Sequence, residues 1–559
     1  MFGAVEGVKI ENLTITDSYF KGKNSGCVVA YAKGNVDLND VVVTNSVAIE
    51  NGVEYPNRFI GYKRVNAEIT TDDGKSQFVT TIEELQTALD KEGNSEINIV
   101  LGCDLIGDVT VTQKEGVKIS IDGQKHKFAG VITVDGQSGT YITAALTIKN
   151  VNFNAGSISS DACIRLGDGT NDTRYTCNVA VEGCTFDVPG AVGVKSYTGG
   201  DKNLTVTGCT ATEKTHSMIQ AKGIDGILVE NCFVYSKNGL NFNNSTNVTV
   251  NYCTTDVKGY AVRFGESSGG EGTAETYFIK NSTLKAACND GDAVVILRGT
   301  ADYSTLNIDN TTLNGTIQIT NNAKEANVII DGTYYVGDAN ALARVVAAGA
   351  TKLYLMPGEY YVHDCGGKTL TINGTKEAIL KLKNKGEDGC DYGFGGNGTG
   401  VGNYTFNGIT INTTDNDGNY KGYAYMKGTF NNCTFVGSYS LNNANDFVFN
   451  DCTFELKGYL WTWAAKSATF NGCTFTGDSR SILAHGTAPT VITINNCKFN
   501  ATEVGKTGAG DPTAAVEIDP AGTNTYTITF EGNNTKTEYY AGWTRIKDGS
   551  TGHTITGLN

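Results

Sequence analysis

An eight-residue pattern that recurs along the chain constrains the fold more than any other feature of the sequence. It reads "FNNCTFVG" from Phe430, "FNDCTFEL" from Phe449, "FNGCTFTG" from Phe470 and "INNCKFNA" from Ile494. The first half of the chain carries shorter versions of it, such as "VEGCTF" from Val181. Within each series the repeated cysteines lie 19 to 25 residues apart. Self-similarity at such a period is the signature of a protein built from stacked repeats.

Each repeat contains two short segments in which apolar and polar residues alternate, which predicts two β-strands. An Asn or Gly between these segments can take the positive φ that a tight corner requires. The repeats contain no helical pattern of comparable length, so helical crossovers cannot connect the strands. Units that cannot bury an apolar face alone must stack, and stacked coils of short strands form a parallel β-helix.

Two segments break the repeat, and we predict that both are capping helices. "TTIEELQTALDKEG" starts with a capping box from Thr81 to Glu84. "GDANALARVVAAGA" starts at the N-cap Asp338 and stops at Gly349. The open end of a β-helix exposes core and unpaired backbone groups, so such a lid is expected there. The predicted parts are the last coils of a preceding β-helix with a linker (residues 1–75), a capped β-helix (76–335) and a second capped β-helix (336–559).

These repeats, with the opening "FGAVEGVKIENLTI", resemble the pectin-lyase-like superfamily of right-handed parallel β-helix proteins over most of the chain. The resemblance implies an all-β solenoid of tandem blocks, each with a short N-terminal capping α-helix. The capped tandem units are similar to large surface and adhesin-like proteins of gut bacteria and to phage tail proteins. The superfamily includes pectate lyases, polygalacturonases, tailspikes and non-catalytic adhesins, so it implies the fold and leaves the activity open.

We predict that the repeated cysteine fills space in the core. In "ITINNCKFN" the alternation points Ile494, Cys497 and Phe499 inward, against the equivalent residues of the next coil. Other coils carry Val151 or Ser282 there, and a buried free Cys behaves as a small hydrophobe. Disulfides between stacked coils would need side chains that turn toward each other. A zinc site would need converging His residues or Cys-x-x-Cys pairs, which the sequence does not offer.

In the last block, one parity of the strands is predicted to face outward with aromatic and acidic side chains. Placing Leu460, Thr462 and Ile482 inward leaves a set of outward residues on the opposite parity. That set is Tyr423, Tyr425, Tyr459, Trp461, Trp463, His485, Glu517 and Asp519. Aromatic faces stack on sugar rings and carboxylates bind hydroxyl groups, so this face is a candidate glycan-binding surface. A register shift of one residue would instead bury the two Trp side chains.

In the middle block, the corresponding outward face is basic and polar. Its predicted members are Arg165, Lys195, Gln220, Asn241, Arg263 and Arg298. On a chain whose net charge is -15, such a line of cations could hold an acidic polysaccharide. The alternative is a solvated sheet face with ordinary charges.

No catalytic constellation stands out, so the sequence favours a protein without enzymatic activity, cofactor or metal. A polygalacturonase-like site needs paired aspartates, a His-Gly element and an Arg-x-Lys element on adjacent coils of one block. Fragments of it are divided between the blocks: Asp290, Asp292, His485, Arg545 and Lys547. A pectate-lyase-like calcium site would have to come from "DACIRLGDGTNDTRY", which begins at Asp161. Glu517 and Asp519 share a face and leave a carboxylate pair open.

The composition and the start of the chain limit its partners and location. An acidic chain argues against nucleic acid, which needs a basic face. No apolar run reaches the length of a transmembrane helix. The first residues lack the basic and apolar regions of a secretory signal. We therefore expect an extracellular or cell-surface protein whose chain is a fragment without its signal peptide, or else a virion protein.

The function that combines these features is a non-catalytic extracellular stalk or adhesin. It would bind polysaccharide or host-cell glycans along an outward sheet face, through weak contacts repeated along the solenoid. Two alternatives stay open. One is a polysaccharide lyase or glycoside hydrolase of the pectin-lyase-like fold. The other is a phage tail fibre or spike, for which a homotrimer is expected.

Overall fold

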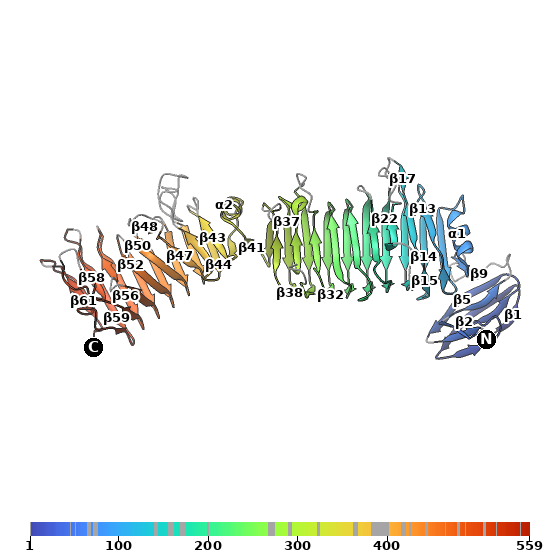
Figure 1. Cartoon of the computed structure of the whole chain (residues 1–559), viewed down its shortest axis with the longest axis horizontal. Helices are drawn as coiled ribbons and strands as arrows, with labels where there is room; N and C mark the ends of the chain where they lie inside the picture. The colour runs from blue at the N-terminus through green and yellow to red at the C-terminus, as the bar shows by residue number, and fades with distance from the viewer. Residues whose placement is uncertain are drawn as a thin grey trace. The chain divides into compact units, whose positions relative to one another are not determined.

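A computed structural model divides the chain into two compact units, Met1–Ala326 and Asn327–Asn559, which are drawn blue to green and yellow to red (Figure 1). Both units are right-handed parallel β-helices, as the repeats predict. The sequence places the boundary after residue 335 and separates residues 1–75, and this finer division stays a prediction. The described residues are 2–558 except 45, 51, 57, 64–68, 71–75, 139–142, 155–160, 168–173, 198–200, 267–273, 289–292, 321, 322, 324, 362–366, 382–401, 415–420, 424, 425, 442–444, 464, 478–480, 487, 507–509, 521 and 548.

The main β-helix of the first unit consists of three stacks of parallel strands. One sheet runs from β10 (Ser76–Val79) to β37 (Thr305–Asp309). A second, of nine strands, runs from β12 (Leu105–Ile106) to β38 (Thr312–Asn314), and a third, also of nine, from β13 (Val109–Thr112) to β39 (Ile317–Ile319). Equivalent residues of successive coils stand in register, for example Ile148, Val181, Val206, Val229 and Val250. Each coil therefore adds one strand to every sheet.

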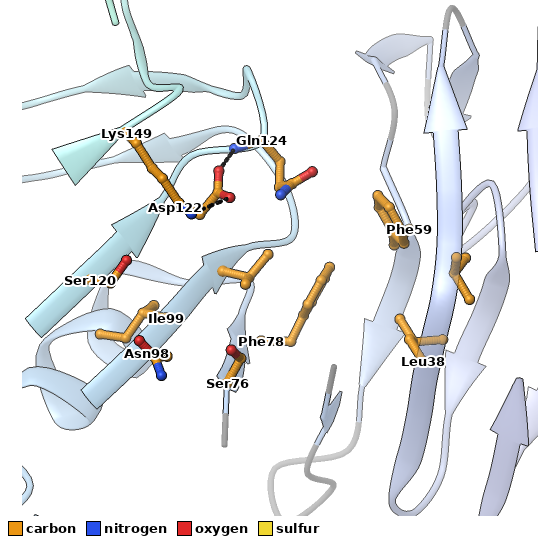
Figure 2. A pocket seen from close by; sticks show the side chains of 12 residues that line it. Leu38, Phe59, Ser76, Phe78, Asn98, Ile99, Ser120, Asp122, Gln124 and Lys149 are labelled. Atoms are coloured by element: carbon orange, nitrogen blue, oxygen red, sulfur yellow. Dashed lines mark hydrogen bonds and ion pairs between the residues drawn. The ribbon is translucent and has the colours of Figure 1, made fainter. Parts of the chain in front are cut away.

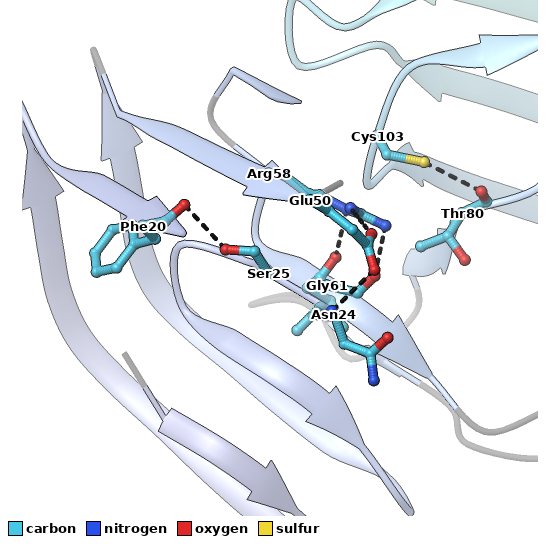
Figure 3. A network of polar contacts seen from close by, with 9 residues as sticks. Phe20, Asn24, Ser25, Glu50, Arg58, Gly61, Thr80 and Cys103 are labelled. Atoms are coloured by element: carbon cyan, nitrogen blue, oxygen red, sulfur yellow. Dashed lines mark hydrogen bonds and ion pairs between the residues drawn. The ribbon is translucent and has the colours of Figure 1, made fainter. Parts of the chain in front are cut away.

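Before this β-helix, the first unit has a short set of coils with its own core. It has three small sheets, and the longest strands of one of them, β2 (Val8–Thr16) and β5 (Val36–Thr44), bury Ile10, Leu38 and Val43. A buried ion pair fastens neighbouring segments, because Arg58 Nη1 lies 3.0 Å from Glu50 Oε2 (Figure 3). Glu50 also accepts a hydrogen bond from the backbone N–H of Asn24, at 2.8 Å. These charges are paired internally and therefore have a structural role.

In the second unit, two long strands of one sheet contain a β-bulge, and beyond the bulge they continue into a second row of strands. One sheet runs from β40 (Asn327–Ile330) to β62 (Thr554–Thr556). The other includes β50 (Thr434–Leu441) and β52 (Thr453–Trp461), whose pairing shifts register between Gly437 and Tyr439. Beyond this bulge, β52 pairs with β55 (Ile482–Ala484), which is followed by β58 (Val516–Ile518) and β61 (Thr544–Ile546). This run of four strands carries the outward aromatic face.

Both predicted capping helices are present. In α1 (Ile82–Asp90), Thr81 Oγ1 accepts a hydrogen bond from the Glu84 N–H, and Glu84 reaches back to the N–H of Thr80, one residue before the expected one. In α2 (Ala339–Ala347), Asp338 accepts hydrogen bonds from two backbone N–H groups of the first turn. Each helix buries its apolar stripe. No helix in the described ranges is long and apolar enough to cross a membrane.

The repeated pattern produces ladders of identical side chains in the core of the second unit. The rings of Phe406, Phe430, Phe449 and Phe470 stack with centroids 4.9 Å apart. Beside them, the cysteines are free and buried, and the Cys452 thiol donates toward the carbonyl of Phe430. The prediction that the cysteine fills space is thus confirmed. At the corner between the two strands of each repeat, the residue before the cysteine takes a positive φ; the φ of Gly472, for example, is 62°.

The second letter of the pattern, an Asn, also forms a ladder, which the alternation of apolar and polar residues does not predict. Each amide Nδ2 donates to the Oδ1 of the previous coil, over 2.7 to 2.9 Å in the interior of the series. The members are Asn373, Asn407, Asn431, Asn450, Asn471 and Asn495. Because an Asn has both donors and an acceptor, identical residues can satisfy one another along the stack. This ladder fixes the register of the coils.

Candidate functional site

The outward aromatic face of the second unit lies over the ends of β52 and β55. The predicted register is confirmed, because Leu460, Thr462 and Ile482 have no exposed surface. The alternate residues point outward: Trp461 is half-buried, and Trp463 is 36% exposed. His485 is half-buried on the next coil, where the register sets it beside Trp463. Trp461, Trp463 and His485 are called the aromatic patch below.

The three rings of the aromatic patch are in mutual contact. The centroids of Trp461 and Trp463 are 6.1 Å apart, with their planes inclined by 28°. The His485 ring lies 5.1 Å from Trp463 and 5.7 Å from Trp461. The His485 Nδ1 contacts the backbone carbonyl of Asp519, which orients the ring. Rings held in this way on a rigid sheet are preorganised for binding a flat, partly apolar ligand.

Charged residues continue the same face on the next two coils. The pairing of β55, β58 and β61 makes two outward rows: Trp461, Leu483, Glu517 and Arg545, and beside it Trp463, His485, Asp519 and Lys547. Lys547 Nζ lies 2.8 Å from an oxygen of Asp519. Arg545 lies 3.5 Å from Glu517 and also pairs with Asp511. The face therefore changes from aromatic to charged along the stack.

Glu517 corrects one sequence prediction. It has the outward parity, but it is 5% exposed, because Arg545 from the next coil covers it and the backbone N–H of Ala514 donates to it. Burial raises the pKa of this carboxyl, although the Ala514 hydrogen bond and Arg545 act in the opposite direction. Glu517 is thus a covered group, and Asp519 remains half-exposed at the surface.

Among the three predicted tyrosines of this face, the structure describes only the side chain of Tyr459. Tyr459 lies on the outward parity of β52 and is half-buried. Tyr423 is in β48 (Lys421–Tyr423), opposite Leu441, and its side chain is outside the described part of the structure. Tyr425 is also outside the described residues.

The basic face of the first unit forms a continuous row only in part. In β20 (Ala162–Leu166), β24 (Val192–Ser196) and β33 (Val262–Phe264), the residues Arg165, Lys195 and Arg263 lie on one outward row. In β36 (Val295–Leu297) the row continues with Ile296, which is buried beside Tyr260. Arg298 lies two residues further along, so its predicted place in this row is wrong. The "VVILRG" strand keeps the expected parity, but its residue paired with Arg263 is Ile296, two positions before Arg298.

One end of this row is neutralised by Asp161. Arg165 lies 3.3 Å from Asp161, and both Lys195 Nζ and the Tyr197 hydroxyl also contact that carboxylate. Partial burial alone would raise the pKa of Asp161, but hydrogen bonds from Lys195 and Tyr197 lower it to about 2. Asp161, a candidate calcium ligand in the sequence, is therefore paired with basic side chains in the structure. Tyr197 was missed, because only the alignment of coils brings it beside Asp161.

Among the fragments of a catalytic site, Asp290 and Asp292 lie outside the described residues. Within the described ranges, no group of three His, Cys, Asp or Glu side chains could hold a metal ion. Burial raises the pKa of the Cys27 and Cys103 thiols to about 11, so these thiols stay protonated at neutral pH.

A cavity of about 360 Å³ lies in the first unit (Figure 2). Phe59 and Leu38 line it from one side, and Phe78, Asp122 and Lys149 line it from the other. The Asp122 carboxylate lies 3.6 Å from Lys149 Nζ and accepts a hydrogen bond from the backbone N–H of Gln124. Its polar groups are thus paired with each other, and they do not converge on a common point in the way that a catalytic site requires.

Comparisons with known proteins add the following. No protein-family model and no curated protein matches the chain. The chain is similar to the solved structure of the PL6 family alginate lyase AlyGC, at 12% identity over 98% of this chain and 97% of that one, with a TM-score of 0.23. A mutant of that lyase matches at 13% identity over 86% and 100%, also with a TM-score of 0.23. The catalytic domain of a GH87 alpha-1,3-glucanase in complex with nigerose matches at 11% identity over 86% and 68%, with a TM-score of 0.16.

Proposed function

We propose that this chain is a non-catalytic glycan-binding protein whose aromatic patch stacks on sugar rings. The observation that carries the proposal is the contact of Trp461, Trp463 and His485 on an outward sheet face, with Trp463 36% exposed. Aromatic side chains that gather in one exposed patch mark binding sites in soluble proteins. Tryptophan is also the aromatic residue that most often dominates binding energy.

A sugar is the ligand that this surface fits best, because it needs apolar and polar contacts side by side. The ring faces of Trp461 and Trp463 would cover the C–H face of a sugar. The Asp519 carboxylate and Lys547 ammonium, on adjoining coils, would bind hydroxyl groups at its edge. The underlying strands are held by their register, so little conformational entropy is lost when the ligand binds.

The stacked coils also suit a structural role. Each of the two β-helical units is a stack of coils whose stability comes from contacts between neighbouring coils. Such a protein would present its binding surface away from an anchoring point. We therefore propose a stalk or adhesin outside the cell, which binds polysaccharide or cell-surface glycans.

The test is a glycan-array screen with the full chain, followed by titration of each hit with the wild type and three variants. Trp463→Ala should weaken binding by roughly tenfold or more, as expected for truncation of a dominant contact, and His485→Ala should weaken it less. Tyr539→Ala is the matched control, because Tyr539 is an aromatic residue of the same unit with 37% exposure. Equal affinity of Trp463→Ala and Tyr539→Ala for every bound glycan would refute the proposal.

One observation supports a second candidate function, a glycoside hydrolase. Glu517 is a covered carboxyl with a raised pKa, as a general acid needs, and Asp519 lies two residues away on the same face. The assay is the release of new reducing ends from each bound glycan. If Glu517→Gln abolishes such release and keeps the binding, the protein is an enzyme and the adhesin proposal fails. The phage tail alternative stays a prediction from the sequence, and a homotrimer in solution would favour it.

A further inference from the structure

A cluster of exposed aromatic side chains also lies in the first unit, on the outer face of the sheet that runs from β12 to β38. Phe233 in β29 (Phe233–Val234) is exposed, and so is Tyr235, two residues further along on the same side. Tyr252 lies at the corner before β32 (Thr254–Val257), the next strand of the sheet, and is 57% exposed. These three residues are called the second-sheet face below. Large aromatic side chains that gather in contact with water on two neighbouring coils mark an interaction surface.

Tyr252 also has a backbone conformation that is unfavourable for its residue type. Its φ is 49°, in the left-handed region. At the equivalent corners of neighbouring coils this region is occupied by Gly208, Asn231 and Asn281. Gly and Asn enter it readily, whereas a bulky aromatic residue does so at a cost in free energy. A side chain that is both exposed and costly to place points to a contact with another molecule.

Charged side chains flank the second-sheet face in a definite order. In the outward row of Tyr235, Asp187 lies two coils before it and Lys285 lies two coils after it. On the coils between them, Lys214 Nζ lies 2.8 Å from an oxygen of Asp187, and Asp256 has an oxygen 2.8 Å from Lys285 Nζ. Along the stack the charges therefore run negative and positive before Tyr235, and negative and positive again after it.

We propose that the second-sheet face binds a second copy of this chain, in a two-fold symmetric dimer whose coils run in opposite directions. The two-fold axis lies along β29, so the aromatic residues of this strand meet the same residues of the partner. Each coil then faces the coil at the same distance on the other side of the axis. Asp187 faces the partner's Lys285, and Lys214 faces the partner's Asp256. The order of the charges is thus complementary to its own reverse, which favours a second copy as the occupant.

The same axis gives the Tyr252 side chain a place on the partner. Tyr252 lies one coil after β29, so it faces the corner one coil before β29 on the partner, which is Gly208. Gly208 is exposed, and a Cβ atom added to it would have no heavy atom closer than 3.8 Å. A ring that protrudes from one copy therefore meets an open corner on the other. A bound sugar would use the aromatic rings, but it would leave the order of the charges and this fit without a role.

The size of the face predicts a weak dimer. Five coils span about 24 Å along the stack, and the residues from Tyr252 to Asp256 span about 17 Å along the strand, so each copy contributes roughly 400 Å². A standard stable interface buries about 800 Å² per partner. The association is therefore expected to be transient and to depend on concentration. The interface is in the first unit and does not depend on the aromatic patch, and a dimer would double the number of aromatic patches in one particle.

The test is sedimentation equilibrium of the full chain at concentrations from about 1 to 500 µM, a range that suits a weak dimer. Phe233→Ser/Tyr235→Ser removes the central aromatic contacts and should raise the dissociation constant by about tenfold or more. Ile106→Ser is the matched control, because Ile106 is an exposed apolar residue of the same sheet, five coils before β29. The control should change the dissociation constant by less than about twofold, as expected of a residue outside the interface.

Tyr252→Asn separates the interface from folding. Asn is the residue at the corners of the two adjacent coils and accepts the left-handed conformation, so this variant should not lower the free energy of unfolding. It should still raise the dissociation constant of the dimer, by about threefold or more, because it removes an aromatic contact. An unchanged dissociation constant would place Tyr252 outside the interface and overturn the proposed axis.

An exchange of charges tests the symmetry of the dimer directly. In a dimer of Lys285→Glu two carboxylates face each other at each of these contacts, and in a dimer of Asp187→Lys two cations do, so each variant alone should dimerise about tenfold more weakly or worse. In an equimolar mixture, the heterodimer again joins opposite charges at both contacts. Mixing should therefore restore association close to that of the wild type. A local defect in folding would not be repaired by mixing.

A wild-type dimer that Phe233→Ser/Tyr235→Ser weakens, that Ile106→Ser keeps and that mixing of the charge variants restores would support the proposal. A monomer at every concentration, a trimer, equal effects of the double variant and the control, or a mixture that stays monomeric would overturn it. So would a monomer whose double variant loses a glycan bound by the wild type, because that result assigns the face to a sugar. Trp463→Ala should leave the dissociation constant of the dimer unchanged, so failure of the glycan proposal and failure of the dimer proposal can be told apart.

Discussion

The asparagine ladder allows a sharp prediction, because interior and terminal positions differ in the number of bonds they make. Asn450 donates to Asn431 over 2.8 Å and accepts from Asn471 over 2.9 Å. Asn450→Ala removes both bonds, and at about 0.5–1.5 kcal/mol each this should lower the free energy of unfolding by about 1–3 kcal/mol. Asn495, at the end of the ladder, donates to Asn471 over a longer distance of 3.5 Å and accepts an exposed hydrogen bond from Asn496 Nδ2 over 3.0 Å. Because the first bond is long and water can replace the second, Asn495→Ala should cost about 0.5 kcal/mol or less.

The assay is urea unfolding followed by circular dichroism, with midpoints compared at equal slope. Both asparagines are half-buried, so the terminal variant controls for loss of an amide at this depth. The double variant Asn431→Ala/Asn450→Ala removes a shared bond, so its cost should be smaller than the sum of the single costs by about 0.5–1.5 kcal/mol. Equal costs for Asn450→Ala and Asn495→Ala, with additive double-variant energies, would refute the claim that the ladder stabilises the stack.

Further predictions concern the core and two carboxylates. Cys452→Ala should lower the free energy of unfolding by roughly 1 kcal/mol, because it removes a buried group about the size of a methylene. The stability of the wild type should not change when a reductant or a chelator is added. A shift of the urea midpoint with either reagent would contradict the space-filling role. Glu517 has a raised pKa in the folded protein, so the carboxyl group favours folding at low pH, and this contribution is lost as the pH rises through that pKa. Glu517→Gln should therefore raise the thermal unfolding temperature at pH 7. A lower unfolding temperature would show that the Arg545 contact outweighs the cost of burial. The pKa of Asp161 is lowered to about 2, so this carboxylate should contribute stability above the unfolded pKa near 4, and the contribution should be lost as the pH falls toward 2. Asp161→Asn should therefore flatten the pH dependence of the free energy of unfolding in that range. An unchanged profile would count against the contacts of Asp161 with Lys195 and Tyr197.

The fold was predictable because the repeat encodes it several times. The alternation around Cys497 gives the inward side, the Asn and Gly corners give the turns, and the breaks at Thr81 and Asp338 mark the lids. The repeated Asn residues are visible in the sequence, but the hydrogen bonds between their side chains could not be predicted from it. Whether Asn431 bonds to Asn407 or to water depends on the register between coils, and loops of unequal length separate those coils in the sequence.

The candidate sites were predictable in part for the same reason. Parity within one strand is local, so "GYLWTWA" places Trp461 and Trp463 together on one side, and the burial of Leu460 and Thr462 in the structure shows that this side is outward. The neighbour on the next coil is not local. Ile296, and not Arg298, stands beside Arg263, because β33 and β36 pair with Val262 opposite Val295, a register that the similarity of "RFG" and "LRG" does not predict.

At Glu517 the direction of a side chain and its exposure to water differ, although a sequence pattern predicts both together. Its parity is outward, yet Arg545 and the loop before β58 cover it. In a β-helix each outward residue has neighbours on the two adjacent coils, and a long side chain there can shield it from water. Three aligned coils are therefore the smallest unit from which exposure can be judged. Trp463 remains exposed because its neighbour on the next coil, His485, lies against its ring at 5.1 Å without covering it. This difference makes the aromatic end of the face, and not its carboxylate end, the surface that is ready to bind a ligand.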